Sequence, residues 1–196
     1  MTDWVSFLIK ISGICTAALF MILLGKLEQK NRIFPWIKLL LQVFIAFLVI
    51  LVGIKIEFLR NNSGSYWYLA NLSIPVTVIW LLSVTNSVGQ TDELGDITPT
   101  IVLIASITFL VVSVFQRQGL VLAEILSLFL IIFSSIIIYL KKRSPVKRGN
   151  YFSSYNMFFG FMLAIIAIVG VLKSTAALTL LTPLLILGFP DRKSVV

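Results

Sequence analysis

The chain has 196 residues, of which 59% are hydrophobic and only 12% are charged, whereas soluble domains carry roughly 25% charged residues. This composition excludes an ordinary water-soluble domain, because an aqueous core cannot take up so much apolar surface. The net charge of +8 comes from cations in short segments between apolar runs, not on a soluble basic face, so we expect no nucleic acid partner.

Seven apolar runs follow one another along the chain, with lengths suited to crossing roughly 30 Å of hydrocarbon as helices. Backbone groups in lipid must bond within their own segment, so the runs are helices despite their many β-branched residues. We therefore predict an all-α fold, a polytopic transmembrane helix bundle that forms one domain over residues 1–196. The predicted helices span residues 5–24, 36–54, 72–88, 97–115, 120–140, 157–172 and 175–189.

Cations concentrate in the first and fifth connections and after the last helix: Lys26, Lys30, Arg32, Lys38, Lys141, Lys142, Arg143, Lys147, Arg148, Arg192 and Lys193. Cytoplasmic loops are enriched in Lys and Arg, so this pattern predicts an external N-terminus and a cytoplasmic C-terminus. The third connection, residues 89–96, is cytoplasmic by the same count yet carries carboxylates and no cation. Residues 61–68 are predicted to form an external turn followed by an interfacial aromatic belt.

Candidate chemistry gathers at the predicted cytoplasmic face. The first connection offers Glu28 and Lys38, and the third offers Asn86 and Asp92. Carboxylates suit Mg²⁺, while Lys and Arg suit phosphates. The alternative interpretation is that these charges are solvated caps and topology signals. The chain has no histidine, which removes the commonest general base and zinc ligand, and its single cysteine excludes disulfides within the chain and thiolate metal sites.

Two polar residues lie inside apolar runs, where such groups are costly and often functional. Glu124 lies near the outer end of its predicted helix, where it can extend to the interface or pair with Arg117. Gln42 is interpreted as a residue that joins two helices by side-chain hydrogen bonds rather than as a substrate contact.

Several segments, taken in order, resemble the polyprenyl-phosphate N-acetylhexosamine-1-phosphate transferase family. The strongest match is residues 72–86 (LSIPVTVIWLLSVTN), followed by residues 92–95 (DELG). Upstream, residues 25–29 (GKLEQ) with Lys38 and Gln42 have the spacing of another family motif. Further matches lie downstream at residues 158–164 (FFGFMLA) and 185–191 (LILGFPD).

Members of that family transfer a sugar-1-phosphate from a UDP-sugar to undecaprenyl phosphate at the cytoplasmic face of the bacterial membrane, using Mg²⁺ and clustered aspartates. The resemblance implies that Asp92 is a catalytic residue and the metal ligand, and that Glu28 is a second catalytic carboxylate. It implies that Asn86 and Lys38 bind substrate, that Mg²⁺ is the cofactor of an active enzyme, and that the chain resides in the bacterial cytoplasmic membrane.

The match departs from the family pattern at its carboxylates. One of the paired aspartates is replaced by Glu28 and the other by neutral Gln29, while Gly95 and Ser153 stand where other carboxylates belong. The His-containing loop, about two leading helices and the final helix of the family are missing from the match. A misplacement of about 1 Å can cost on the order of 10²-fold in rate, so these departures predict impaired catalysis.

Three hypotheses follow for the function. The first is a degenerate transferase relative that acts as a scaffold or regulatory partner of an active transferase, or as a homo-oligomer. The second is an active, divergent transferase that uses Asp92, Glu28 and Lys38. The third is a small transporter or structural membrane protein unrelated to the family.

Overall fold

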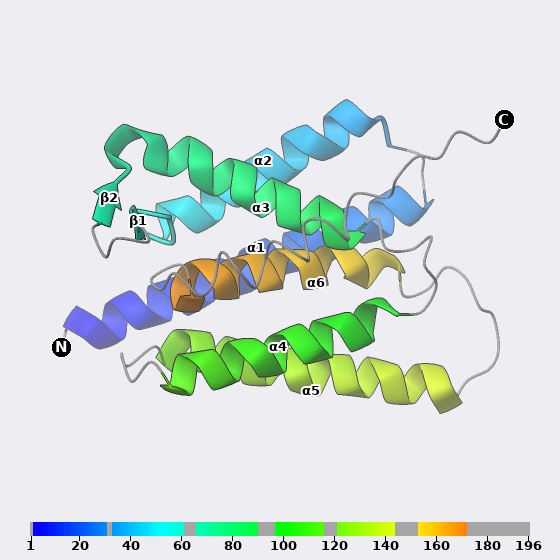
Figure 1. Cartoon of the computed structure of the whole chain (residues 1–196). Helices are drawn as coiled ribbons and strands as arrows, with labels where there is room; N and C mark the ends of the chain where they lie inside the picture. The colour runs from blue at the N-terminus through cyan, green and yellow to red at the C-terminus, as the bar shows by residue number, and fades with distance from the viewer. Residues whose placement is uncertain are drawn as a thin grey trace, which may run out of the picture.

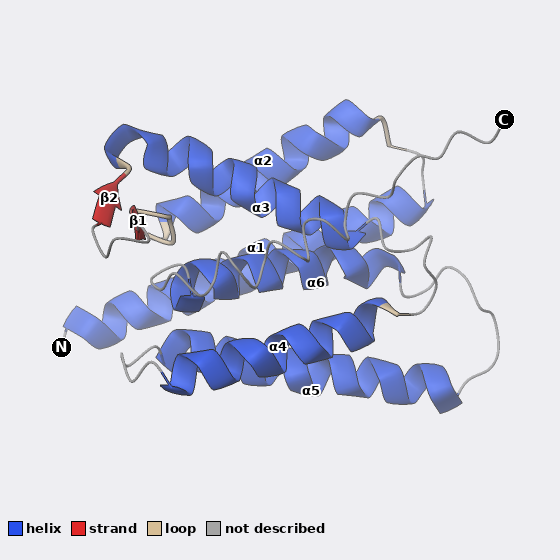
Figure 2. Cartoon of the chain, in the orientation of Figure 1, coloured by secondary structure: helices blue, strands red, loops and turns tan. Residues whose placement is uncertain are grey.

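The computed structural model describes residues 2–30, 33–60, 66–89, 97–115, 121–143 and 153–171, which form an antiparallel bundle of helices (Figures 1 and 2). The helices are α1 (Thr2–Lys30), α2 (Pro35–Leu51), α3 (Ser73–Gly89), α4 (Thr98–Phe115), α5 (Val121–Arg143) and α6 (Ser153–Ile166), the last continuing as the π-helical turn η3 (Ala167–Val171). Between α2 and α3 lie the strands β1 (Phe58–Arg60) and β2 (Tyr66–Tyr68) and the 3-10 turn η1 (Ala70–Leu72).

These helices confirm the predicted transmembrane bundle. The structure describes helices at six of the seven predicted positions, and the predicted helix at residues 175–189 lies outside the described residues. Four helical segments are long and apolar enough to cross a membrane: Trp4–Lys30, Ala70–Gly89, Thr98–Phe115 and Val121–Leu140. Two more are apolar but shorter, Pro35–Leu51 and Tyr155–Gly170.

The structure adds one element to the predicted all-α fold. Strands β1 and β2 form an antiparallel hairpin in which Phe58 lies opposite Tyr68 and Arg60 opposite Tyr66. The sequence pattern predicted a turn and an aromatic belt here but no strands, because three residues per strand are too few to produce a period-two pattern.

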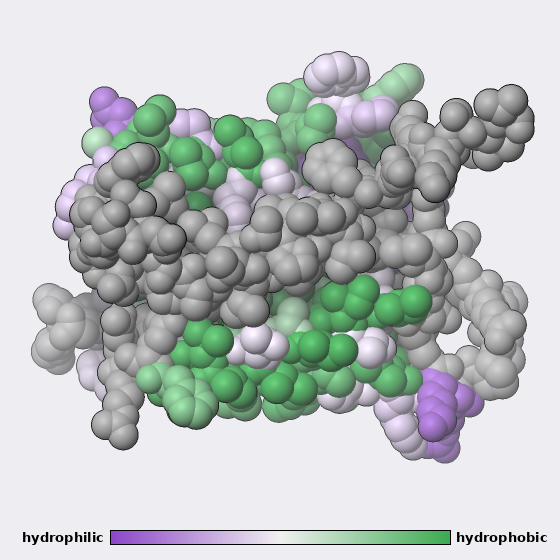
Figure 3. All heavy atoms as spheres, viewed as in Figure 1, coloured by the Kyte–Doolittle hydropathy of each residue, from purple (hydrophilic) through white to green (hydrophobic). Residues whose placement is uncertain are grey.

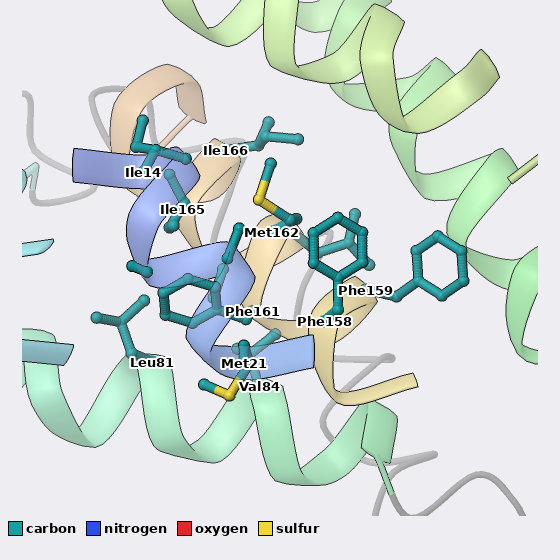
Figure 4. Close-up of a cluster of buried hydrophobic side chains, with 14 of the residues drawn as sticks. Ile14, Met21, Leu81, Val84, Phe158, Phe159, Phe161, Met162, Ile165 and Ile166 are labelled. Carbon is teal, nitrogen blue, oxygen red and sulfur yellow. The ribbon is translucent and has the colours of Figure 1, made fainter. Parts of the chain in front are cut away.

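The central helix α6 makes the core. Its residues from Met157 to Ile166, and Ala167 and Ile168 of η3, are almost completely buried, so this part of α6 is apolar all round and is enclosed by the other helices. Figure 4 shows Phe161 of α6 close to Leu81 of α3 and Met21 of α1. In Figure 1, α1 and α6 form a middle tier, with α2 and α3 on one side and α4 and α5 on the other.

A glycine sets the spacing between α6 and α3. A Cβ atom on Gly160 would lie 2.9 Å from the Thr85 Cα and the Val88 Cβ. In lipid there is little hydrophobic drive between helices, so close van der Waals packing at small residues has to hold them together. Gly160 therefore allows the close approach of α3 to the central helix.

The outward faces of the bundle are apolar. Large hydrophobic side chains are exposed on α2, α4 and α5, among them Trp36, Leu51, Phe115 and Ile132. Figure 3 shows hydrophobic residues over much of the visible described surface. Such a surface is better suited to contact with hydrocarbon than with water, which agrees with the apolar composition of the sequence.

Helix α2 ends at Leu51, three residues earlier than predicted, because Gly53 adopts a left-handed φ of 85°. The Gly53 N–H donates to the Ile50 carbonyl at 2.9 Å and the Ile54 N–H donates to the Val49 carbonyl at 3.2 Å, which is a Schellman motif. Val49 and Ile54 are both buried, as the hydrophobic contact of that motif requires.

The chain beyond α2 is fastened to the first turn of α3. The Thr77 hydroxyl accepts from the Ile56 N–H at 2.9 Å and donates to the Ser73 carbonyl at 2.6 Å. The Ser73 hydroxyl in turn donates to the Ile56 carbonyl at 2.7 Å. Because all three residues are buried, these bonds satisfy backbone groups that would otherwise lack a partner in an apolar setting.

Candidate functional site

Successive helices run in opposite directions, so α1, α3 and α5 end where α2, α4 and α6 begin (Figure 1). Glu28, Lys38 and Asn86, three of the predicted site residues, lie on α1, α2 and α3 near this shared end. The hairpin β1–β2 lies at the opposite end, on the left in Figure 1. These three residues therefore lie near one end of the bundle, as expected, while their roles in a cytoplasmic site stay a prediction.

Glu28 and Lys38 form an ion pair that joins α1 to α2. The Lys38 Nζ donates to the Glu28 Oε1 at 2.6 Å. The side chains are 38% exposed for Glu28 and 22% for Lys38, so the pair lies at the margin of the bundle rather than in its core. The pair forms because α1 continues to Lys30, beyond its apolar run, and because Pro35 starts α2 at its first position.

Gln42 and Asn86 form a second link, from α2 to α3. The Gln42 Nε2 donates to the Asn86 Oδ1 at 3.1 Å, and the Asn86 Nδ2 donates back to the Gln42 Oε1 at 3.0 Å. The same Asn86 nitrogen also donates to the Leu82 carbonyl, one turn earlier, at 2.9 Å. Gln42 is only 1% exposed. The interpretation of Gln42 as a helix-joining residue is confirmed.

The two links are continuous, because Lys38 and Gln42 lie four residues apart on α2 and therefore on one face of that helix. We call Glu28, Lys38, Gln42 and Asn86 the polar clasp. It crosses three helices, from the partly exposed ion pair to the buried amide pair. Each of its side chains is bonded to another member of the clasp.

The predicted metal ligand and catalytic residue Asp92 lies outside the described residues, as do the carboxylates Glu93 and Asp96. Glu124 is in the first turn of α5, at the opposite end from the clasp, and Arg117 lies outside the described residues. Ser153, which the sequence resemblance matched to a family carboxylate, begins α6 at the same end as the clasp.

The clasp does not fit a Mg²⁺ ion in this arrangement. Mg²⁺ takes six oxygen ligands in a near-ideal octahedron at about 2.0–2.1 Å. Glu28 is occupied by an ammonium group, and the amide oxygens of Gln42 and Asn86 each accept a hydrogen bond from the other residue. A cation here would face the charge of Lys38 and break these bonds. Among the described residues, no group of three or more Asp, Glu, His or Cys side chains is placed to hold a metal.

Two buried polar residues near this end were not singled out from the sequence. Thr98 begins α4 with 2% of its surface exposed, and Asn156 lies in the first turn of α6 with 5% exposed. The available signal was their position, since each is a polar residue in the first turn of an apolar helix, next to a cation-rich or acidic connection.

Apolar helices with polar side chains joined at one end define a multi-pass membrane protein. A family model described as glycosyl transferase family 4 matches residues 11–171, so the chain belongs to that family. This confirms the resemblance found in the sequence, and it contradicts the third hypothesis, that of an unrelated membrane protein.

The chain is also similar to a curated protein of Bacillus subtilis (strain 168), named as a probable undecaprenyl-phosphate N-acetylglucosaminyl 1-phosphate transferase. The two are 26% identical over 186 residues, which cover 92% of this chain and 50% of the relative. The chain therefore spans about half the length of this curated relative. No solved structure is a significant match.

Proposed function

We propose that the chain is a catalytically impaired member of glycosyl transferase family 4 that binds undecaprenyl phosphate in the bacterial cytoplasmic membrane. In this proposal it serves as a scaffold or regulatory partner of an active transferase, or of a second copy of itself. The lipid and the sugar nucleotide class come from the family resemblance and from the name of the Bacillus subtilis relative.

The observation that supports impaired catalysis best is the Glu28–Lys38 ion pair. The family resemblance matches Glu28 to one of the family's paired aspartates and Gln29, which has no charge, to the other. With Lys38 at 2.6 Å, the remaining carboxylate is bonded within the protein instead of being open toward a ligand. A site for phosphoryl transfer depends on positioning and charge neutralisation, and losing one preorganised electrostatic contact costs roughly 10²–10³-fold in rate.

The amide pair supports the same proposal. The family resemblance matches Asn86 to a retained asparagine of the family motif, but the amide oxygen and nitrogen of Asn86 are both bonded to Gln42. A bond that joins two helices stabilises the bundle whether or not substrate is present. The amide pair is thus better suited to joining α2 and α3 than to binding a substrate during a reaction cycle.

An active, divergent transferase is the second candidate, and the gathering of Glu28, Lys38 and Asn86 near one end favours it. In that case Asp92 is the principal catalytic carboxylate and Mg²⁺ ligand, Glu28 is its second carboxylate, and Lys38 and Asn86 bind the substrates. The UDP-sugar is then a substrate in addition to the lipid.

The test is an assay of the purified full chain in nanodiscs with labelled UDP-N-acetylhexosamines and undecaprenyl phosphate, with Mg²⁺ or with EDTA. We expect no labelled lipid and no UMP, while an active transferase of the family turns over beside it. We also expect undecaprenyl phosphate, but not undecaprenol, to raise the melting temperature of the chain. Undecaprenol is the matched ligand because it lacks only the phosphate.

Sustained turnover would overturn the proposal in favour of the active enzyme, and Asp92→Asn should then abolish the turnover. An equal thermal shift with undecaprenol would contradict binding through the phosphate. The partner role is tested separately by co-purification with a tagged active transferase from membranes. Absence of the chain from that complex, together with a monomer in native mass measurements, would contradict it.

A further inference from the structure

Lys38 is a partly buried cation at the margin of the bundle at this end. Four other described cations lie at the same end with exposed positions: Lys26, Lys30, Lys142 and Arg143. Lys38 is different because its ammonium is bonded to a carboxylate, and because its helix is fixed by the amide pair one turn further along. A group with this preset position is better suited to binding a single anion than the exposed cations are.

We propose that Glu28 is a built-in competitor for the phosphate of a lipid headgroup: its carboxylate holds Lys38 in the resting protein and is displaced when the phosphate binds Lys38. This inference rests on the proposed function, because it assigns a mode of regulation to the lipid-phosphate site. The exchange is one anion for another at the Lys38 ammonium, with no bond to carbon or phosphorus made or broken.

The exposure of the pair makes this exchange favourable. Ion pairs between partly exposed side chains are weak, because water screens the charges and two long side chains lose freedom. Glu28 and Lys38 keep 38% and 22% of their side-chain surface exposed. A phosphate monoester carries up to two negative charges, so it interacts with the same ammonium more strongly than one carboxylate does.

The surroundings of Lys38 favour a lipid over a free anion. Phe34, four residues before Lys38, is 73% exposed, and Leu41, three residues after it, is 39% exposed. Phe34 is the N-cap of α2, and its carbonyl accepts from the Lys38 N–H at 3.2 Å, while Leu41 lies about one turn beyond Lys38 on the helix. Exposed apolar side chains thus flank Lys38 at the start of α2, which suits a molecule with a hydrocarbon chain and a phosphate end.

The rest of the clasp holds Lys38 in place, so that only the Glu28 side chain has to move when the ion pair opens. Gln42 is buried and doubly bonded to Asn86, so the face of α2 that carries Lys38 is fixed relative to α3. Glu28 lies two residues before the end of α1 and is the more exposed partner. Displacement therefore requires only that the Glu28 side chain turn outward.

The experiment measures binding of undecaprenyl phosphate to the full chain in phosphatidylcholine nanodiscs containing EDTA, by thermal-shift titration. We expect Glu28→Gln to bind the lipid more tightly by a factor on the order of ten, because the substitution removes both the competitor and a nearby negative charge. Glu28→Asp, which keeps the charge but shortens its reach by one methylene, should fall between the parent and Glu28→Gln. Lys38→Gln should lose most of the binding.

The chain offers a matched control at the opposite end. Glu57 pairs with Lys55 at 3.5 Å, and its side chain is also partly exposed. Glu57→Gln changes the net charge of the protein by the same amount and breaks the same kind of ion pair, so it should leave lipid binding at the parental level. Titration with inorganic phosphate distinguishes a lipid phosphate from a free phosphate as the ligand. We expect the chain to bind inorganic phosphate far more weakly than the lipid, and Glu28→Gln to strengthen this weak binding.

Three outcomes would overturn the inference. Weaker or unchanged binding by Glu28→Gln would do so, provided that its melting temperature without lipid shows a folded protein. Equal tightening by Glu57→Gln would show a general charge effect. A gain of lipid affinity on adding Mg²⁺ that Glu28→Gln abolishes would make Glu28 a metal ligand. The proposed function fails on a different result, turnover, so the two tests can fail separately.

Discussion

Gln42 and Asn86 bond each other twice across the contact between α2 and α3, and these two residues stand 44 positions apart in the chain. Replacing one of them removes both bonds and leaves the other amide without its partner. Side-chain hydrogen bonds between membrane helices contribute about 0.6 kcal/mol on average and at most about 1.7 kcal/mol. We therefore expect Gln42→Leu to lower the free energy of unfolding by about 1–2 kcal/mol, measured by steric trapping in bicelles.

The control for that prediction is Thr108→Val, because the exposed Thr108 hydroxyl bonds only to the Ile104 carbonyl of its own helix. We expect Thr108→Val to change the free energy of unfolding by no more than about 0.5 kcal/mol. In a double-mutant cycle, Gln42→Leu and Asn86→Leu together should cost less than the sum of the single changes. Strict additivity would show that the two amides do not depend on each other.

Gly160 provides a second prediction, at the contact of α3 with the central helix. A Cβ at Gly160 would meet the Thr85 Cα at 2.9 Å and the Thr85 carbonyl oxygen at 3.0 Å, and backbone atoms cannot turn aside. We expect Gly160→Ala to destabilise the bundle by about 1–3 kcal/mol, the usual range for overpacking, and to lower the melting temperature in detergent.

Gly89 is the matched control for Gly160, since both glycines lie at the α3–α6 contact. A Cβ at Gly89 would lie 3.2 Å from the Met157 Cγ, which belongs to a flexible side chain that can shift by a few tenths of an ångström. Gly89→Ala should therefore leave the melting temperature close to that of the parent. Equal losses in the two variants would mean that the loss of glycine, and not the close approach, determines the effect.

Helix positions were predictable from the sequence because hydropathy and length are local properties, but helix ends were less so. The prediction ended the first helix at residue 24, next to Gly25 and a run of polar residues, whereas α1 continues to Lys30. A single glycine costs only about 1 kcal/mol in a helix, so it need not end one. At the end of α2 the relevant signal was present in Gly53, whose left-handed φ is a conformation that glycine adopts easily.

The sequence predicted at which end of the bundle the candidate site lies, but it did not predict which side chains bond to each other there. Alternating helix direction, seen in Figure 1, together with their positions in α1, α2 and α3, brings Glu28, Lys38 and Asn86 toward one end. That Glu28 would pair with Lys38 instead of facing a ligand depends on the length of α1 and on how closely α1 approaches α2. Those quantities follow from tertiary packing, for which a single sequence has no direct signal. The assignment of Asp92 stays a prediction.

Thr77 supports a third prediction, for the segment between α2 and the hairpin. Its hydroxyl accepts from the Ile56 N–H and donates to the Ser73 carbonyl. Thr77→Val keeps the shape of the side chain but leaves a buried N–H without an acceptor, which costs about 1–3 kcal/mol. We expect amide exchange at Ile56 to speed up on the order of tenfold or more, measured by hydrogen–deuterium exchange. Unchanged exchange at Ile56, with Thr108→Val as the reference, would contradict the assigned bond.

The orientation of the bundle is the last prediction, and it decides whether the polar clasp faces the cytoplasm. Cations dominate the end at which α1 and α5 finish, and positive loops stay cytoplasmic. In a variant with Cys15→Ser, single cysteines introduced at Lys30 and Lys142 should resist a membrane-impermeant maleimide added to intact spheroplasts and react after lysis. A cysteine at Glu57, beside the hairpin, should react before lysis. The reverse labelling pattern would show that the bundle has the opposite orientation in the membrane. Labelling of the cysteines at positions 30 and 142 from opposite sides would contradict the antiparallel order of the helices.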